Sequence, residues 1–335
     1  MNSLKHIPIL DPLRGLAALA VVLFHFTGSI LPTLRPSPLE GPFDYGKWGV
    51  QVFFVISGFV IPHAMERSGY IWAGLGRFMT RRFIRIAPPA YAAALLMILF
   101  YYTAIFVNGR PVEGNEIPGL SLRSIVANIT FLVPYMDTQW FNFVYWSLTV
   151  EFEFYLLLAL LFPFIQAGSP SWRVALVLAT IVVCSLVPGP VLFPYAGYFA
   201  LGMVVFVWQR KDVDRWLLAV IVLLICALDI YRGNSTPIFI SLVAALIIAS
   251  GTSLRTGPPD WLGKVSYSLY ITHVPAGYFA ESVLKRVLSI HGTTNGKMLM
   301  LLVYVIIALL VAQLFYHVVE RPFLHSSKRH ARVQR

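Results

Sequence analysis

Long apolar blocks alternate with short polar segments along almost the whole chain. Four of the blocks are nearly free of charged residues: Leu95–Val107, Val174–Val187, Trp216–Ile230 and Met298–Val319. Apolar stretches of about 18 residues or more are long enough to cross the bilayer core as helices. One soluble core could not use so many of them. The pattern therefore predicts an all-α, polytopic transmembrane helix bundle.

The apolar blocks and the Pro- and Gly-rich turns between them divide the chain into about ten predicted spans. We expect helices at residues 10–30, 47–64, 88–107, 146–166, 174–188, 195–208, 216–231, 238–253, 265–284 and 298–319. A further apolar segment, residues 125–136, is too short to span a bilayer, so we expect it to be re-entrant or interfacial.

Basic residues are distributed unequally between the two sides of this predicted bundle. With ten spans, 17 of the 26 lysines and arginines fall on the side of the N-terminus and eight on the other side, while Arg14 lies within the first helix. The positive-inside rule therefore predicts that both termini are cytoplasmic. The excess on one side also supports an even number of spans.

Composition agrees with a membrane environment. Hydrophobic residues make up 58% of the chain and charged residues only 12%, whereas soluble domains carry about 25% charged residues. The net charge of +11 does not predict nucleic-acid binding, because the basic residues lie between apolar blocks. Cys184 and Cys226 both lie inside predicted spans, so we expect neither a disulfide framework nor a metal site. We expect one transmembrane domain over residues 1–335 and no separate soluble domain.

The first predicted helix carries three ionisable residues, which are costly inside hydrocarbon and are therefore functional candidates. Asp11 and Arg14 are an i, i+3 pair near the cytoplasmic surface. His25 lies eleven residues beyond Arg14, on the same helix face and with a rise of roughly 16 Å. A buried neutral histidine bonded to a carbonyl is the structural alternative. Its depth and its alignment with Arg14 favour a functional role for His25.

A basic amphipathic stretch, residues 77–86, precedes Pro88 and Pro89 at the predicted cytoplasmic interface. Arg82 and Arg85 are i, i+3 neighbours on a helix. Two interpretations are open from the spacing alone. Either the arginines fix the orientation of the protein in the membrane and contact lipid phosphates, or they bind the phosphates of a nucleotide-bearing substrate through bidentate hydrogen bonds.

Two further predicted helices carry polar stripes. Ser147, Glu151 and Tyr155 share one face while Glu153 points elsewhere, and Glu151 could orient or charge-balance a histidine on a neighbouring helix. The stripe Ser266, Tyr270 and His273 fits either a site lining or hydrogen bonding between helices. Ser57 and Gly58 lie in an apolar helix, where small residues more often serve close packing.

Residue chemistry alone leaves a proton-coupled transporter as a second interpretation, but six motifs occur together and in order. They are residues 10–18 running to His25, residues 49–58, Arg82-Phe-Ile-Arg85, residues 146–151, residues 266–270 with His273, and Glu320-Arg-Pro322. With these motifs the chain resembles the acyltransferase 3 family of membrane acyltransferases over essentially its whole length.

The resemblance implies transfer of an acyl group, usually acetyl, from acyl-CoA to a hydroxyl of a cell-envelope or exported glycan. It implies that His25 is catalytic with Arg14 as its companion, and that Arg82 and Arg85 hold the donor. We assign Ser57 and Gly58 to donor binding, Glu151 to stabilising protonated His25, and Asp11, Ser147, Tyr155, Tyr270 and His273 to the site lining. No metal is expected.

In the mechanism that this resemblance implies, neutral His25 removes a proton from the acceptor hydroxyl while the hydroxyl oxygen attacks the thioester. Transient acylation of His25 is equally compatible with the sequence. The expected partners are a glycan or glycolipid acceptor and membrane lipid, without nucleic acid, and the expected location is a bacterial cytoplasmic membrane. A transporter or flippase, for which no inverted repeat is found, and a non-catalytic export component remain as alternatives.

Overall fold

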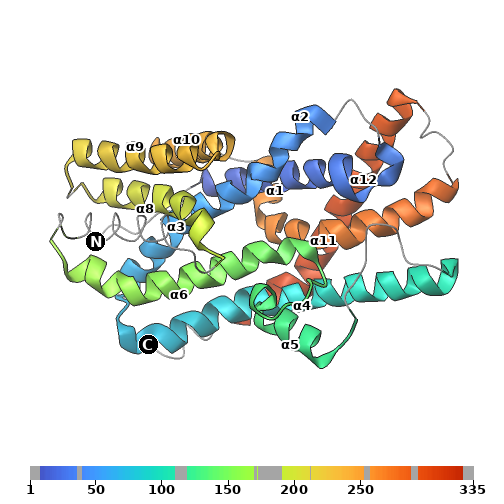
Figure 1. Cartoon of the computed structure of the whole chain (residues 1–335), viewed down its shortest axis with the longest axis horizontal. Helices are drawn as coiled ribbons and strands as arrows, with labels where there is room; N and C mark the ends of the chain where they lie inside the picture. Colours follow the sequence, from blue (N-terminus) through green and yellow to red (C-terminus); the bar gives the residue numbers. More distant parts are fainter. Residues whose placement is uncertain are drawn as a thin grey trace. The chain divides into compact units, whose positions relative to one another are not determined.

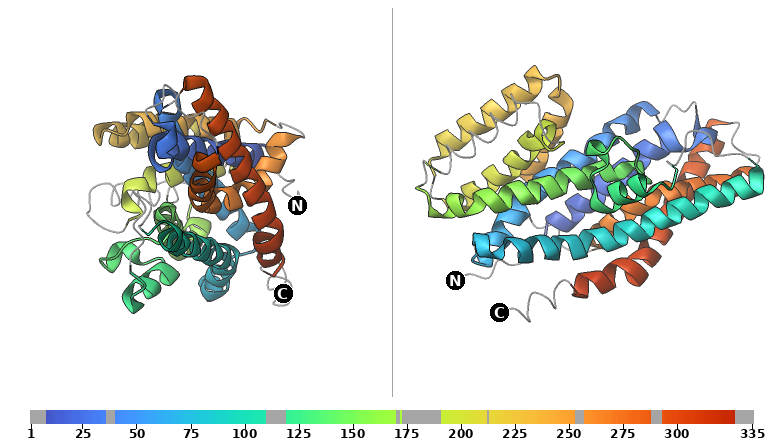
Figure 2. Two further views of the ribbon diagram at one scale, coloured as in Figure 1. Left: turned by 90° about the vertical axis from the view of Figure 1, so that its right-hand side faces the viewer. Right: turned by 60° about the horizontal axis from the view of Figure 1, so that its bottom comes forward.

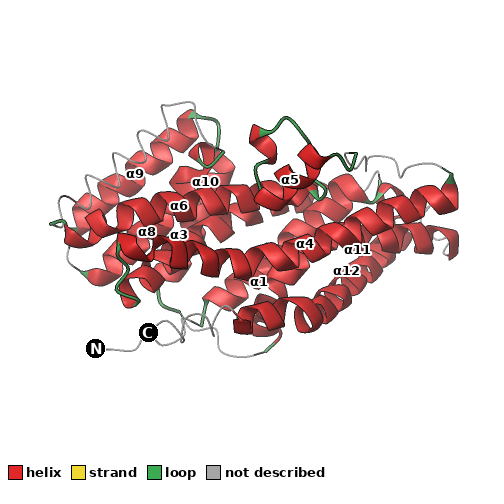
Figure 3. Ribbon diagram, turned by 90° about the horizontal axis from the view of Figure 1, so that it is seen from below, coloured by secondary structure: helices red, strands yellow, loops and turns green. Residues whose placement is uncertain are grey.

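The chain folds into helices and the loops that connect them. The computed structural model describes residues 8–35, 40–109, 119–169, 172, 191–211, 213–252, 257–287 and 293–326. Within these ranges there are helices and loops but no strand (Figure 3). This confirms the predicted all-α class. The predicted helix 174–188 lies outside the described residues.

The longer helices overlap the apolar blocks of the sequence, although α4 and α11 begin earlier than predicted. Their bounds are α1 Leu10–His25, α3 Gly49–Arg67, α4 Leu75–Asn108, α6 Trp146–Ala167, α8 Ala196–Arg210, α9 Arg215–Tyr231, α10 Ser235–Ala249, α11 Pro258–Val287 and α12 Thr294–Phe315. Two short helices are α2 Glu40–Asp44 and α5 Leu122–Thr130, and π-helical turns follow α1 at Phe26–Ile30 and α12 at Tyr316–Glu320.

Five segments of the described chain are long and apolar enough to cross a membrane. They are Leu10–Gly28, Glu40–Arg67, Trp72–Phe106, Phe143–Ala167 and Thr294–Ser326. The protein is therefore a multi-pass membrane protein. The helices α8, α9 and α10 are shorter, at 15, 17 and 15 residues, and α11 is long but carries several buried polar side chains. The count of ten spans stays a prediction.

Helix α4 begins earlier than the sequence predicts. It runs without interruption from Leu75 to Asn108 and contains Pro88 and Pro89 (Figure 2), although a proline pair usually ends or kinks a helix. Hydroxyl groups from neighbouring segments bind the backbone around this pair. Tyr267 donates to the carbonyl of Ile86 at 2.7 Å and Tyr145 to that of Ala90 at 2.6 Å. The basic stretch 77–86 is thus the first part of a long helix.

The chain divides into two compact units, each built from three separate segments. Unit 1 comprises Met1–Ala17, Val50–Met79 and Leu148–Gly263, and unit 2 comprises Ala18–Gly49, Thr80–Ser147 and Lys264–Arg335. Several helices, α1 among them, contribute residues to both units. The described part of each unit has its own buried apolar core.

In unit 1, α8, α9 and α10 pack side by side (Figure 1), and α3 crosses α8 at two glycines. A Cβ atom on Gly58 would lie 2.1 Å from the carbonyl oxygen of Phe199, and one on Gly202 would lie 2.1 Å from that of Val55. The two backbones therefore touch at this crossing. Small residues allow such close approach between membrane helices.

Replacing Gly202 by valine should destabilise unit 1. The new side chain would meet backbone atoms of Val55, Gly58 and Phe59, which cannot move without separating the helices, and overpacking of this kind costs about 1–3 kcal/mol or more. The unfolding temperature of the purified protein should fall. Gly76→Ala is the matched control, because a Cβ at Gly76 meets nothing within 4 Å. Equal unfolding temperatures for the two variants would contradict the tight crossing.

A buried carboxylate on α11, that of Glu281, connects three segments of unit 2. Glu281 accepts hydrogen bonds from the backbone N–H of Thr33 at 3.1 Å, from the Thr33 hydroxyl at 2.7 Å and from the Tyr304 hydroxyl at 2.5 Å. These contacts tie the segment after α1 to α11 and α12. In the same unit, the rings of Phe100 on α4 and Tyr278 on α11 stack on each other.

The short apolar segment 125–136 forms the end of α5 and a following turn, and it is too short to span, as predicted. Asn128 fixes its position in unit 2. Its amide donates to the carbonyls of Ser124 and Gln139, and its oxygen accepts from the backbone of Phe141. The Tyr91 hydroxyl of α4 donates to the carbonyl of Ile129. The segment therefore packs against α4.

Candidate functional site

His25 is the last residue of α1, where the helix changes its hydrogen-bonding pattern. A π-helical turn, Phe26–Ile30, follows it directly, and π-helical turns inside helices are frequent at functional sites. His25 is partly exposed. Its Nδ1 lies 2.9 Å from Nε2 of His273, which comes from α11, 248 residues later in the chain. The structure thus places two of the predicted site residues in direct contact.

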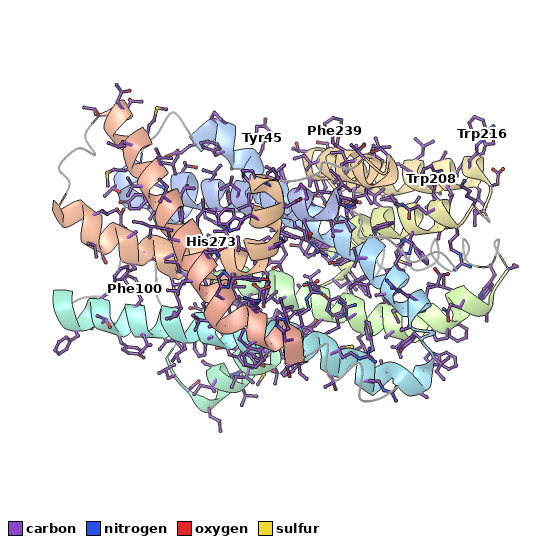
Figure 4. The ribbon with its side chains drawn as sticks, turned by 180° about the vertical axis from the view of Figure 1, so that it is seen from behind. Tyr45, Phe100, Trp208, Trp216, Phe239 and His273 are labelled. Atoms are coloured by element: carbon purple, nitrogen blue, oxygen red, sulfur yellow. The ribbon has the colours of Figure 1, made fainter. Side chains whose placement is uncertain are left out.

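His273, which Figure 4 labels, is fully buried, with 0% of its surface exposed. Its Nδ1 faces two backbone carbonyls of its own helix, that of Tyr270 at 2.8 Å and that of Leu269 at 3.2 Å. The sequence left open whether the polar stripe Ser266, Tyr270 and His273 lines a site or only joins helices. For His273 the structure shows a direct contact with the candidate catalytic residue.

Aromatic rings surround the two histidines within unit 2. Phe143 meets His25 edge to face at a centroid distance of 5.2 Å, and Phe26 lies 6.3 Å from His273. Asn142, which is completely buried, donates to the carbonyl of Ile271 at 3.0 Å and so anchors the Phe143 turn to α11. The pair therefore lies in a largely apolar setting, where hydrogen bonds are stronger than in water.

One glycine permits the close approach of α11 to the end of α1. A Cβ on Gly277 would lie 2.8 Å from the ring of Phe26 and 3.1 Å from Ile30. Gly277 follows His273 by four residues, so both lie on the same face of α11. The small residue and the histidine thus belong to one contact surface. Gly277 was not among the predicted site residues, because nothing in its local sequence distinguishes it.

Tyr270 and Ser147 form a second contact between predicted site residues. Their hydroxyl oxygens lie 2.6 Å apart, and each also reaches the carbonyl of Val144, both at 3.0 Å. Both side chains are buried. These contacts join α11 to the first turn of α6, which supports a structural role. Their role as site lining stays a prediction.

Glu151 lies in unit 1, where it accepts hydrogen bonds from two predicted site residues. The Ser57 hydroxyl of α3 donates to it at 3.1 Å, and the Tyr155 hydroxyl, one helical turn further along α6, donates to the same oxygen. The common face of Glu151 and Tyr155 is confirmed. Glu153 points elsewhere, as predicted, and accepts from the backbone N–H of Leu192 at 2.6 Å. Charge stabilisation of His25 by Glu151 stays a prediction.

Near the start of α1, Arg14 and Asp11 form the expected i, i+3 ion pair at 3.8 Å. Both residues belong to unit 1. Arg14 and His25 lie on one continuous helix, which confirms the predicted alignment along α1. Gly58 lies at the crossing of α3 and α8 described above, so packing explains this glycine. Donor binding, its predicted role, is not needed to explain why a glycine occurs at this position.

Arg82 and Arg85 lie on α4, where Arg85 is exposed and Arg82 partly exposed. Arg85 interacts electrostatically with Glu320 of the π-helical turn after α12. Glu320 is buried and accepts a hydrogen bond at 2.6 Å from Ser268 of α11. It was absent from the predicted site, although its motif was recognised. Among the described residues, no group of three or more His, Cys, Asp or Glu side chains could hold a metal ion.

Curated relatives of this chain are bacterial O-acetyltransferases. It is 25% identical to a putative peptidoglycan O-acetyltransferase of Bacillus subtilis, over 95% of this chain and 55% of the relative. It is 23% identical to a peptidoglycan O-acetyltransferase of Listeria monocytogenes and 24% identical to an O-acetyltransferase of Staphylococcus aureus, over 96% of this chain in both cases. The chain therefore spans little more than half the length of these relatives, 55–58%.

No solved structure matches the chain significantly. A family model described as an acyltransferase domain matches residues 7–317, which is nearly the whole chain. The match includes the first five of the six motifs in full and all the predicted site residues. The protein therefore belongs to the acyltransferase 3 family of integral membrane acyltransferases.

Proposed function

We propose that this protein is a membrane O-acetyltransferase that moves an acetyl group from acetyl-CoA to a hydroxyl of a cell-wall glycan, with His25 as the general base. The observation that carries the proposal is the contact between His25 and His273 at 2.9 Å in a chain that belongs to an acyltransferase family. The names of the relatives support peptidoglycan as the acceptor class. Family membership also favours this function over a transporter.

In the proposed reaction, the neutral imidazole of His25 takes the proton of the acceptor hydroxyl while the hydroxyl oxygen attacks the thioester carbonyl. The C–S bond then breaks, and the imidazolium returns its proton to the leaving thiolate, which gives free CoA and the acetyl ester. A hydroxyl is a weak nucleophile at neutral pH, so this step needs a positioned base. His25 is partly exposed and can meet a substrate, whereas His273 cannot.

For the donor, we propose that Arg82 and Arg85 bind the phosphates of CoA. Arg82 and Arg85 lie on α4 at i and i+3, which is about one helical turn, and arginine forms strong, bidentate hydrogen bonds with phosphate. They belong to the same unit as His25. Arg14, which lies on the same helix as His25, is proposed to be the companion of His25 in the reaction.

The proposed topology has ten spans with both termini in the cytoplasm of a bacterial inner membrane, because the basic residues are concentrated on that side. In intact cells, a membrane-impermeant thiol reagent should then label Lys47→Cys but not Lys211→Cys, in a background without the native cysteines. Labelling of both positions, or only of the second, would contradict this orientation.

The function is tested with purified protein in nanodiscs, acetyl-CoA and soluble peptidoglycan fragments. Free CoA and acetylated fragments should appear together, in equal amounts and only when both substrates are present. Fragments whose hydroxyls are blocked beforehand serve as the control for O-acetylation. Release of CoA without an acetyl ester, or no consumption of acetyl-CoA with any glycan, would overturn the proposal.

A further inference from the structure

Three residues of α11 contact successive parts of the segment that begins at His25. They are His273, Gly277 and Glu281, and their spacing of four places them on one face of the helix. His273 contacts His25 at 2.9 Å, Gly277 lies against the π-helical turn that follows, and Glu281 binds Thr33. All these residues belong to unit 2. One face of α11 therefore follows this segment from His25 to Thr33.

The first and last of these contacts have the same register. His25 and His273 are 248 residues apart in the chain, and so are Thr33 and Glu281. The two segments thus advance by the same number of residues between the contacts, and they run in the same direction. A shift of one segment along the other would break both contacts at once. The position of Thr33 on α11 is therefore coupled to the position of His25.

The backbone between the two contacts leaves regular α-helical geometry. Helix α1 ends at His25, the π-helical turn follows it, and Leu31 then has φ −118° and ψ 89°, which lies outside the helical region. A regular α-helix therefore does not continue beyond His25 and hold it from that side. Beyond the turn, it is the contacts of Thr33 with α11 that hold the chain.

The hydrogen bonds between Glu281 and Thr33 are specific. One carboxylate oxygen accepts from the backbone N–H of Thr33 at 3.1 Å, and the other accepts from its hydroxyl at 2.7 Å. Thr33 lies in the short 3-10 turn Pro32–Leu34, and the first N–H groups of such a turn have no acceptor within it. Glu281 is only 5% exposed, so its carboxylate needs donors of this kind. Tyr304 on α12 supplies a further one at 2.5 Å.

We propose that Glu281 is a positioning residue that fixes the register of the segment from His25 to Thr33 against α11 and so holds His25 beside His273. It acts through the backbone of the π-helical turn. A catalytic group that is misplaced by about 1 Å can lower a rate by about 10²-fold, so a contact this far from the reacting atoms affects turnover. The inference rests on the proposed function, in which His25 is the base.

Two hydroxyl deletions separate positioning from general stabilisation. Thr33→Val removes a hydroxyl on the segment of His25, and Tyr304→Phe removes one on α12, so each variant takes one hydrogen bond from Glu281. Phenylalanine keeps the ring at position 304, which meets Phe26 edge to face. Thr33→Val should lower kcat about tenfold, the factor of one hydrogen bond to a carboxylate, and Tyr304→Phe should stay within about twofold. KM for acetyl-CoA should be unchanged in both.

Substitution of Glu281 itself should have a larger effect. Glu281→Leu removes both hydrogen bonds to Thr33 and should lower kcat by about 10²-fold. Glu281→Gln should retain most of the activity, because its amide oxygen can accept from the backbone N–H of Thr33 while its NH₂ group donates to a hydroxyl. The unfolding temperature shows whether each variant is folded. A wild-type kcat in folded Glu281→Leu would overturn the inference, as would equal losses of kcat in Thr33→Val and Tyr304→Phe. If Glu281→Leu does not fold, the two hydroxyl deletions decide.

The ring signals of His25 report its position independently of activity. They are observed in ¹⁵N-histidine-labelled protein in nanodiscs and assigned by their absence in His25→Ala. Thr33→Val should shift these signals, whereas Tyr304→Phe should leave them in place. Equal shifts in both variants, or no shift in either, would overturn the inference. If the shifts are as expected but the wild type transfers no acetyl group to any acceptor, the proposed function fails and the role of Glu281 in the register stands.

Discussion

Alanine in place of His25 should lower the rate of acetyl transfer by about 10²–10⁴-fold, the range that a positioned general base contributes. The substitution removes the only partly exposed member of the histidine pair, and fully buried His273 cannot replace it. The loss should appear in kcat. Affinity for CoA should be retained, because the proposed phosphate contacts of α4 are unchanged. Initial rates of CoA release in nanodiscs, together with calorimetric titration of CoA, measure both quantities.

The matched control for this prediction is His317→Ala. His317 lies in the π-helical turn after α12 and is exposed, and its Nε2 contacts the side-chain amide nitrogen of Gln313, one helical turn back, at 2.7 Å. Its removal should leave the rate unchanged within about twofold, since surface substitutions of this kind have small effects. A wild-type rate for His25→Ala, in protein with a normal unfolding temperature, would show that His25 takes no part in the reaction.

The sequence predicted the helices best where an apolar block is bounded by clear turns. For α6, the predicted range 146–166 differs from Trp146–Ala167 by a single residue. The prediction was poorer for α4 and α11, which both begin earlier. In α4 the proline pair suggested a boundary, but tyrosine hydroxyls distant in sequence bind the backbone around it. In α11 the first turns are polar, and composition alone does not show that they continue the helix.

The candidate site was predictable where its contacts are local. The pairs Asp11–Arg14 and Glu151–Tyr155 follow from the helical repeat, and the structure contains both. The contacts of His25 with His273 and of Ser57 with Glu151 join residues 248 and 94 positions apart. Helical periodicity shows which residues share a face. It does not show which faces meet, because that depends on how the helices pack.

The close packing of helices explains why the sequence did not predict these long-range contacts. Gly277 allows α11 to approach Phe26, and Gly202 allows α8 to approach α3. In a membrane, small residues permit such contacts and buried polar groups are then satisfied across them. The same residue type at an uncrowded position, such as Gly76, has no such role. A glycine in an apolar helix therefore identifies a crossing only once its neighbour is known.

Replacing Arg82 or Arg85 by alanine should weaken donor binding and leave the chemical step intact. A hydrogen bond to a charged group contributes about 1.5–3 kcal/mol, so each substitution should raise KM for acetyl-CoA by about 10- to 100-fold at roughly 1.4 kcal/mol per factor of ten. The value of kcat at saturation should stay within about twofold, because a group that binds substrate and transition state equally affects KM alone.

Lysine at the same positions tests whether geometry or charge matters. It preserves the charge but not the planar fork of donors, so Arg85→Lys should recover only part of the affinity. It also keeps a positive charge near buried Glu320, which limits any effect on folding. The control is Arg215→Ala at the start of α9, an arginine that packs on the exposed ring of Trp216 on the same predicted side of the membrane.

The phosphate that each arginine binds can be identified with dephospho-CoA thioesters, which lack the 3′-phosphate. If Arg85 binds that phosphate, the wild type should lose affinity for the shortened donor, while Arg85→Ala should bind both donors equally. An equal loss in the wild type and in Arg85→Ala would assign Arg85 to the pyrophosphate. A fall in kcat at unchanged KM would contradict a donor site on α4, because the arginines would then act on catalysis. An equal effect of Arg215→Ala would also contradict it, because the arginines would then act through the lipid surface.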